Sequence, residues 1–228
     1  MVTAHNQLHD NTQTMEQQEP PEFLLDIFAD PRSVHDIVKG ILHTIFFHRF
    51  FPSITPKSRD ILDISLPYVD DDELETMIEQ RVAALERQLD AQRSSGNTNN
   101  ASNGTGGRGQ LVVQFFEKRR RKAWLSRGDE EVCWESWTVK VTVAEPRTES
   151  ERAKVRRAME QTLQATAMKI VTFSNTHKDH IPPITTQGTN PFPYKINLDQ
   201  ETTSWATRLR VGDLSKAAKY AALWFLST

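Results

Sequence analysis

Two segments in the middle of the chain carry apolar side chains at every second position, and the residues that connect the segments are charged. The alternating apolar residues are Leu111, Val113 and Phe115 in the first segment and Trp137, Val139, Val141 and Val143 in the second. A period of two with β-branched and aromatic residues is the pattern of a β-strand. The two segments therefore predict a long hairpin with a charged tip.

A helix is predicted between Pro31 and Pro52 by a wide stripe of apolar residues. The stripe recurs at helical spacing and consists of Val34, Ile37, Val38, Ile41, Leu42, Ile45 and Phe46. Its width suits a helix that lies against a sheet. Ser33, with Asp36 three positions later, indicates a start that resembles a capping box, and Pro52 ends the helix.

Two further helices follow from the same spacing. The earlier one comes after three consecutive carboxylates at 70–72, which favour the positive end of a helix. Its narrower stripe consists of Leu74, Ile78, Val82, Leu85 and Leu89. The later helix runs from about 149 to 175, and Thr148 with Glu151 predicts a capping box at its start.

Shorter apolar segments complete the pattern. Strands are predicted at 22–30, around 61–66, at 193–198 and at 204–211, and an apolar tail that fits a helix follows at 217–225. The predicted order is β-α-β-α-β-β-α-β-β. Three helices and a small antiparallel sheet around one core indicate an α+β domain.

Polar segments set the expected domain boundaries. Residues 1–21 are rich in Gln, Asn, His and Thr, and we expect them to form a disordered N-terminal tail. Residues 22–228 have the size of a single domain. Within this domain, a stretch rich in Gly, Asn, Ser and Thr at about 93–110 predicts a flexible insertion.

Composition narrows the classes of protein that fit. The formal net charge is −2, so no global field attracts nucleic acid or a membrane surface. The single cysteine, Cys133, excludes an internal disulfide and fits a reducing compartment. Glu130 and Glu131 discourage its thiolate, so a packed thiol is expected. No apolar stretch approaches the ~18 residues of a membrane-spanning helix, and the first residues lack the regions of a signal peptide.

Residues suited to catalysis are sparse. His177 and His180 have the spacing of a metal-ligand pair, but only Asp179 accompanies them, so a solvated loop is the simpler interpretation. His43 and His48 lie about 140° apart around the first helix, with His48 placed as a cation at its end. No nucleotide-binding glycine motif and no nucleophile motif occurs. The sequence therefore predicts no catalytic site, no metal and no cofactor, and the protein is not expected to be an enzyme.

A run of five basic residues occupies the connection of the predicted hairpin: Lys118, Arg119, Arg120, Arg121 and Lys122. The run is compatible with a solvated tip, with a transient contact to an anionic membrane, or with a nucleic-acid or nuclear-import patch. Nucleic-acid binding normally places stacking aromatic residues among the cations, and only Trp124 stands there. Trp124 and Leu125 leave apolar area at the tip of a loop, which predicts a protein-binding surface.

Two more tryptophans, Trp134 and Trp137, stand three positions apart in the second strand. A regular strand places such residues on opposite faces. Trp137 shares its parity with the valines of the strand and is predicted to lie in the core, which leaves Trp134 for the surface.

Three blocks of the sequence resemble the autophagy-related protein 101 family. The blocks are VKGILHTIFFHR at 38–49, FFEKRR at 115–120 and WESWTVKV at 134–141. They are correctly spaced relative to one another, and the resemblance extends from about Phe23 to Val211. It implies a HORMA fold, in which three helices lie over an antiparallel sheet and a C-terminal segment can rearrange.

The resemblance also implies how the protein acts. Members of the family are non-catalytic subunits of the autophagy-initiation kinase complex. They pair with the HORMA domain of autophagy-related protein 13, stabilise it, and recruit downstream factors to the pre-autophagosomal structure in the cytoplasm. The family's exposed finger is a Trp followed closely by a Phe; Trp124 matches the Trp, while Leu125 and Ser126 stand where Pro and Phe are expected. Trp124 and Leu125 are thus the predicted finger. The alternative is a chromatin- or nucleic-acid-associated HORMA protein that uses the basic run at 118–122.

Overall fold

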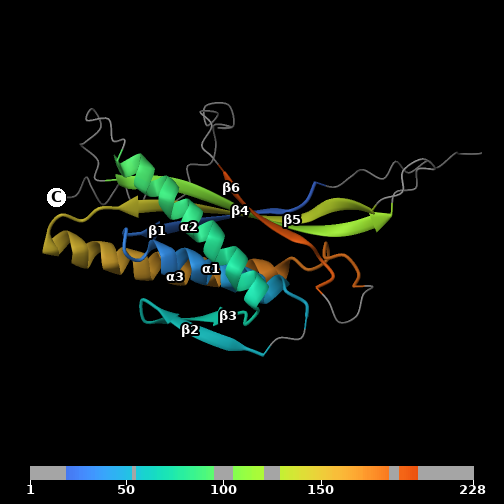
Figure 1. Cartoon of the computed structure of the whole chain (residues 1–228). Helices are drawn as coiled ribbons and strands as arrows, with labels where there is room; N and C mark the ends of the chain where they lie inside the picture. Colours follow the sequence, from blue (N-terminus) through green and yellow to red (C-terminus); the bar gives the residue numbers. More distant parts are fainter. Residues whose placement is uncertain (1–18, 53–54, 95–104, 121–128, 185–189, 200–228) are drawn as a thin grey trace, which may run out of the picture.

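A four-stranded sheet lies at the centre of the structure (Figure 1). Across the sheet, the strands are β1 (Glu22–Ala29), β5 (Asp129–Ala144), β4 (Thr105–Arg120) and β6 (Tyr194–Asp199). β4 is antiparallel to both of its neighbours, but β1 runs parallel to β5. The predicted antiparallel sheet is therefore wrong for the β1–β5 pair and holds for the other two pairs. About a hundred residues and two helices separate β1 from β5, so no hairpin turn constrains their relative direction.

The computed structural model describes residues 19–52, 55–94, 105–120, 129–184 and 190–199. Most of the predicted N-terminal tail, the predicted strand at 204–211 and the apolar tail at 217–225 lie outside these residues. In the described part of the chain, the elements follow in the order β1, α1, β2, β3, α2, β4, β5, α3 and β6. This order agrees with the predicted one up to β6, except that two strands, not one, separate the first two helices.

Three helices cover the sheet: α1 (Val34–Arg49), α2 (Asp72–Ser94) and α3 (Glu149–Thr176). α3 packs against β1 and α1, and α2 packs against β4, β6 and α1. The predicted apolar stripes of α1 and α2 are buried along their whole length. The predicted α+β fold class is confirmed, because these helices and the sheet enclose one core.

The starts of the helices test the predicted caps. α3 begins with the predicted capping box, in which the Thr148 side chain accepts from the Glu151 backbone and the Glu151 side chain accepts from the Thr148 backbone. At α1, the Ser33 side chain makes no capping bond, so that prediction is wrong. Asp30 instead accepts bonds from the backbone N–H groups of Arg32 (3.0 Å) and Ser33 (2.7 Å), which leaves Ser33 as one of the donors.

A small separate hairpin packs against α1. Its strands are β2 (Lys57–Ile61) and β3 (Ile64–Tyr68), where the sequence predicted one extended segment. The turn consists of Leu62 and Asp63, whose φ angles are 49° and 64°. These left-handed residues are not glycine or asparagine, so the turn lacks the usual sequence signal of a two-residue hairpin.

The predicted insertion at 93–110 is shorter than expected. α2 extends to Ser94 and β4 begins at Thr105, so only 95–104 remain, and they lie outside the described residues. The glycines of this stretch bring β4 close to α2: a Cβ at Gly109 would lie 2.3 Å from Leu85 Cδ1. A glycine-rich strand beneath a helix therefore accounts for 105–110, which composition alone assigned to a linker.

Candidate partner-binding site at the base of the β4–β5 arm

The paired ends of β4 and β5 continue past the ends of α1 and α3 (Figure 1). We call this extension, residues 116–120 and 129–133, the arm. It confirms the predicted long hairpin. The predicted finger residues Trp124 and Leu125, together with Arg121 and Lys122, lie outside the described residues, in the segment that connects the two strands of the arm.

Three of the five basic residues lie in the arm and not in its tip. Lys118, Arg119 and Arg120 pair across the strands with Glu131, Glu130 and Asp129. The sequence assigned the whole run to the connecting tip, which is wrong for these three. Lys118 and Arg119 thus stand opposite carboxylates of the neighbouring strand, and opposite charges in facing positions stabilise strand pairing. Contact with an anionic surface through the run remains a prediction.

Further contacts connect the arm to β6 and stiffen it. Lys195 of β6 lies 2.7 Å from Glu131, and its ammonium lies 4.5 Å from the centre of the Phe116 ring. The bond to Lys195 lowers the pKa of Glu131 below its usual value. Arg119 also bonds Glu117 of its own strand at 2.6 Å. The arm is thus a connected unit, although each exposed ion pair contributes little by itself.

A β-bulge marks the base of the arm. Phe115 pairs with Glu135 and Phe116 pairs with Cys133, so Trp134 has no partner in the opposite strand. The extra residue reverses the parity of the strand beyond it. Trp137 is fully buried, as predicted, but Trp134 is buried as well, and its predicted place at the surface is wrong. Because β5 is not a regular strand at this point, its alternation does not determine the side on which Trp134 lies.

Both tryptophans pack among aromatic rings. Trp137 lies 4.5 Å from Phe23, measured between ring centres, and Trp134 lies 5.0 Å from Phe192 and 5.7 Å from Phe115. These contacts join β1, β4, β5 and the segment before β6. The base of the arm is therefore part of the core, while its far end is exposed at Lys118 and Arg119.

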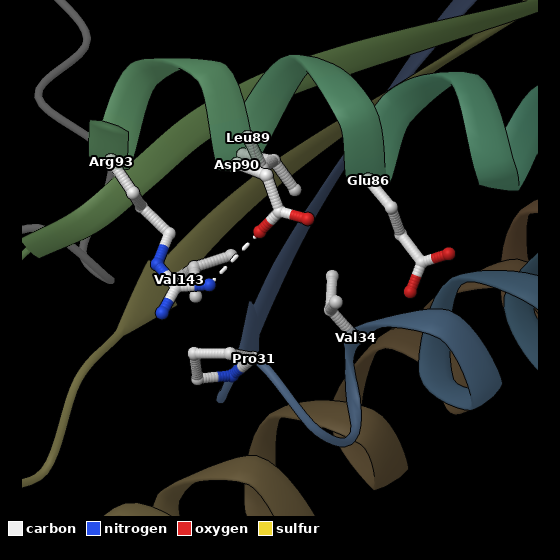
Figure 2. A pocket seen from close by; sticks show the side chains of 7 residues that line it. All are labelled: Pro31, Val34, Glu86, Leu89, Asp90, Arg93 and Val143. Carbon is white, nitrogen blue, oxygen red and sulfur yellow. Dashed lines mark hydrogen bonds and ion pairs between the residues drawn. The ribbon is translucent and has the colours of Figure 1, made fainter. Parts of the chain in front are cut away.

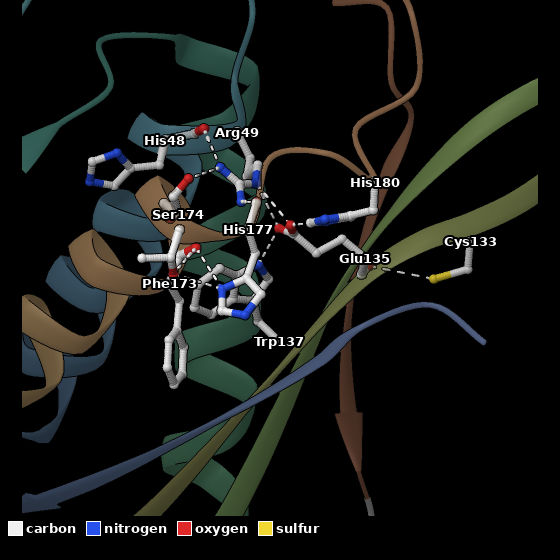
Figure 3. A network of polar contacts seen from close by, with 10 residues as sticks. His48, Arg49, Cys133, Glu135, Trp137, Phe173, Ser174, His177 and His180 are labelled. Carbon is white, nitrogen blue, oxygen red and sulfur yellow. Dashed lines mark hydrogen bonds and ion pairs between the residues drawn. The ribbon is translucent and has the colours of Figure 1, made fainter. Parts of the chain in front are cut away.

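A buried carboxylate, Glu135, lies at the bulge and is the centre of a polar network (Figure 3). It accepts two bonds from Arg49 Nε, at 2.8 and 2.9 Å. His180 Nε2 donates at 2.7 Å and the indole N–H of Trp137 donates at 2.5 Å. Glu135 has no exposed surface and Arg49 is 3% exposed. A buried ion pair persists only where further bonds satisfy both partners, as they do here.

Arg49 extends the network to the ends of two helices. Its Nη1 donates to the carbonyls of His48 (3.1 Å) and Ser174 (3.5 Å), and its Nη2 donates to the carbonyl of His177 (3.2 Å). A guanidinium is suited to this role because it carries five donors in a fixed plane. Sequence analysis missed the network. The available signal was Glu135 itself, a charged residue at a position whose parity predicts the core.

The histidines at 177 and 180 have different bonding partners. His180 bonds Glu135, while His177 Nδ1 lies 2.8 Å from the hydroxyl of Thr176. Among the described residues, no group of three or more potential ligands could hold a metal ion. Cys133 is half-buried, and burial is the main cause that raises the pKa of its thiol.

A second polar cluster joins α1 to α2. Lys39 bonds Glu75 and Glu79 at 2.6 and 2.8 Å, and His43 bonds Glu75 at 2.8 Å. Burial lowers the pKa of His43 to about 4, although Glu75 acts in the opposite direction. Burial, together with the nearby charges of Arg49 and Lys178, also lowers the pKa of His48, which disfavours the predicted cation at the end of α1.

A small hollow lies on another part of the surface, between α2 and the start of α1 (Figure 2). It is lined by Pro31, Val34, Glu86, Leu89, Asp90, Arg93 and Val143. Arg93 bonds Asp90 at 2.9 Å and also pairs with Glu145, so its charge is already satisfied. We see no catalytic arrangement in this hollow.

No helix in the described ranges is both long and apolar enough to cross a membrane.

Known proteins identify the family. A family model described as autophagy-related protein 101 matches residues 26–188, which include the arm and the Glu135 network. The chain belongs to the autophagy-related protein 101 family. Membership assigns the chain a role in autophagy. The α+β arrangement is consistent with the HORMA fold that the resemblance implied.

Relatives of the same name occur in distant organisms. Autophagy-related protein 101 of Homo sapiens is 27% identical over 217 residues, which cover 82% of this chain and 93% of the relative. The relative from Arabidopsis thaliana is 26% identical, with 79% and 87% covered. The one from Schizosaccharomyces pombe is 25% identical, with 77% and 85% covered.

Proposed function

We propose that this member of the autophagy-related protein 101 family is a non-catalytic adaptor of the autophagy-initiation kinase complex. It pairs with the HORMA domain of autophagy-related protein 13 and stabilises that domain. Through Trp124 and Leu125 at the tip of the arm, it recruits further subunits or downstream factors. We place this activity in the cytoplasm, at the pre-autophagosomal structure.

The arm is the observation that carries the proposal. It extends beyond the helices, its base is anchored in the core at Trp134 and Glu135, and it leads directly to the segment that contains Trp124 and Leu125. An aromatic residue on such a projection is the type that most often dominates a protein–protein interface.

Direct binding tests the proposed pairing. The purified full chain, mixed with the HORMA domain of autophagy-related protein 13 from the same source, should elute as a 1:1 complex in size-exclusion chromatography with light scattering. At a concentration of the chain a hundredfold above the dissociation constant, linkage stabilises the partner domain by about 2.7 kcal/mol, which raises its melting temperature.

The pairing is wrong if the two proteins elute separately at micromolar concentration and the melting temperature of the partner domain does not change. A matched comparison is the Trp124→Ala/Leu125→Ala double variant, which should pair as well as the natural chain, because the finger serves a different partner.

A further inference from the structure

We propose that Glu135 is a positioning residue for the arm: its buried network with Arg49 and His180 fixes the direction in which the arm leaves the sheet. The inference rests on the proposed function in one respect, namely that the direction of the arm matters because the finger is at its tip. The geometric part stands on the described residues alone.

The network lies at the bulge, where the arm leaves the core of the sheet. Cys133 pairs with Phe116 on the arm side of the bulge, and Glu135 pairs with Phe115 on the core side. A bulge bends its strand and increases the local twist, so small rotations at this point move the far end of the arm over large distances. Contacts that fix the conformation of the bulge therefore also fix the direction of the arm.

Glu135 holds the bulge against several elements at once. Through Arg49 it is joined to the last turn of α1 and to the carbonyls of Ser174 and His177 at the end of α3. Through His180 it is joined to the loop that follows α3. These partners come from different parts of the chain and approach the carboxylate from different directions (Figure 3).

Any rearrangement that breaks the bonds of Glu135 is energetically costly. Glu135 is completely buried, and a buried carboxylate that loses one charged donor is left without compensation. The arm itself is connected by the bond between Lys195 and Glu131 and by the backbone pairing of its two strands. A stiff arm on a fixed bulge points in one direction.

Distance measurements between spin labels test the inference without any partner. One label is placed on the arm at Lys118→Cys and the other on the exposed side of α3 at Gln161→Cys. The background carries Cys133→Ser, which keeps a donor to the Glu135 carbonyl. Pulsed electron resonance on this protein should give one narrow distance distribution. Two variants of the network, Glu135→Gln and His180→Phe, should at least double its width or shift its maximum.

The two variants change the network to different degrees. Glu135→Gln removes the charge and could impair folding, whereas His180→Phe keeps the ion pair with Arg49 and the ring against Trp134 and removes one bond. Circular dichroism confirms that each labelled protein is folded. Glu145→Gln breaks the exposed pair with Arg93, remote from the network, and should leave the distribution unchanged.

An unchanged distribution in folded His180→Phe overturns the inference. A change of equal size in Glu145→Gln also overturns it, because loss of any ion pair would then suffice. These outcomes are separate from those of the proposed function: a chain that pairs with no partner could still show the expected distances, and a chain that pairs normally could fail to show them.

Discussion

Among single residues, His43 is the clearest case in which burial outweighs a neighbouring charge. Its imidazole bonds Glu75 at 2.8 Å, yet burial lowers its pKa to about 4. The neutral ring can donate from Nε2 to the carboxylate, and its Nδ1 has no hydrogen-bond partner among the described residues. The nearby His35 behaves differently: desolvation is the largest single influence and acts to lower its pKa, but the bonds to Glu79 and Asp36 together outweigh it and raise the pKa.

We expect His43 to make the protein less stable in weak acid. Its pKa lies below that of the unfolded chain, so its contribution is fully present above pH ~6.5 and is lost as the pH falls toward 4. Between pH 7 and 5 this loss is on the order of 2 kcal/mol. Urea unfolding at both pH values should show that His43→Gln reduces the dependence on pH.

His35 should have the opposite influence on how stability depends on pH. Its raised pKa contributes stability that is present at low pH and is lost as the pH rises. His35→Gln should therefore make the free energy of unfolding fall more steeply as the pH is lowered. If His43→Gln and the natural chain lose the same free energy of unfolding between pH 7 and 5, His43 is not neutral in the folded protein.

At the level of elements, sequence patterns predicted what depends on neighbours along the chain. The stripe of α1, the capping box of α3 and the paired strands β4 and β5 all follow from local spacing. The bulge at Trp134 and the parallel pairing of β1 with β5 do not, because both depend on contacts between distant segments. For the same reason the Arg49–Glu135 pair, separated by 86 positions, could not be assigned from the sequence.

The two helix starts provide a prediction with its own control. Thr148→Ala removes a side-chain oxygen that accepts a bond from Glu151 N, and it should lower the free energy of unfolding by about 1 kcal/mol. Ser33→Ala should change the free energy of unfolding by at most about a few tenths of a kcal/mol, since the Ser33 side chain makes no such bond at α1. Chemical denaturation of both variants measures the difference. Equal losses of the free energy of unfolding in the two variants would contradict a stabilising role for the capping bond at α3.

On the scale of the whole molecule, the base of the arm brings together the ends of α1 and α3, the bulge of β5 and the segment before β6 (Figure 1). These contacts lie within the part of the chain that matches the autophagy-related protein 101 model, except for Phe192 and the strand after it. The core thus supports a projection, which is the arrangement that the proposed adaptor role requires for binding one partner with the body of the domain and another with the arm.

Charge across the molecule predicts that duplex DNA is not a ligand. The net charge is −2, and Lys118 and Arg119 of the basic run stand opposite Glu131 and Glu130 in the paired strands. Fluorescence anisotropy with labelled duplex DNA should detect no binding at physiological salt. Replacing Glu130 and Glu131 by Gln unmasks the cations and should increase affinity at low salt. Tight binding by the natural chain, with a steep slope of log affinity against log salt, would support the nucleic-acid alternative.

The most direct test of the account replaces the natural chain by Trp124→Ala/Leu125→Ala in cells that lack this family member. Purified complexes from starved cells should retain autophagy-related protein 13 and lose the finger-dependent factors at least tenfold. The melting temperature of the variant should change by no more than about a degree, as expected for residues outside the core. Met168→Ala/Ile184→Ala, which truncates two exposed apolar residues elsewhere, is the matched control and should retain every partner. A finger variant that recruits all partners normally, or that melts many degrees lower, would contradict the account.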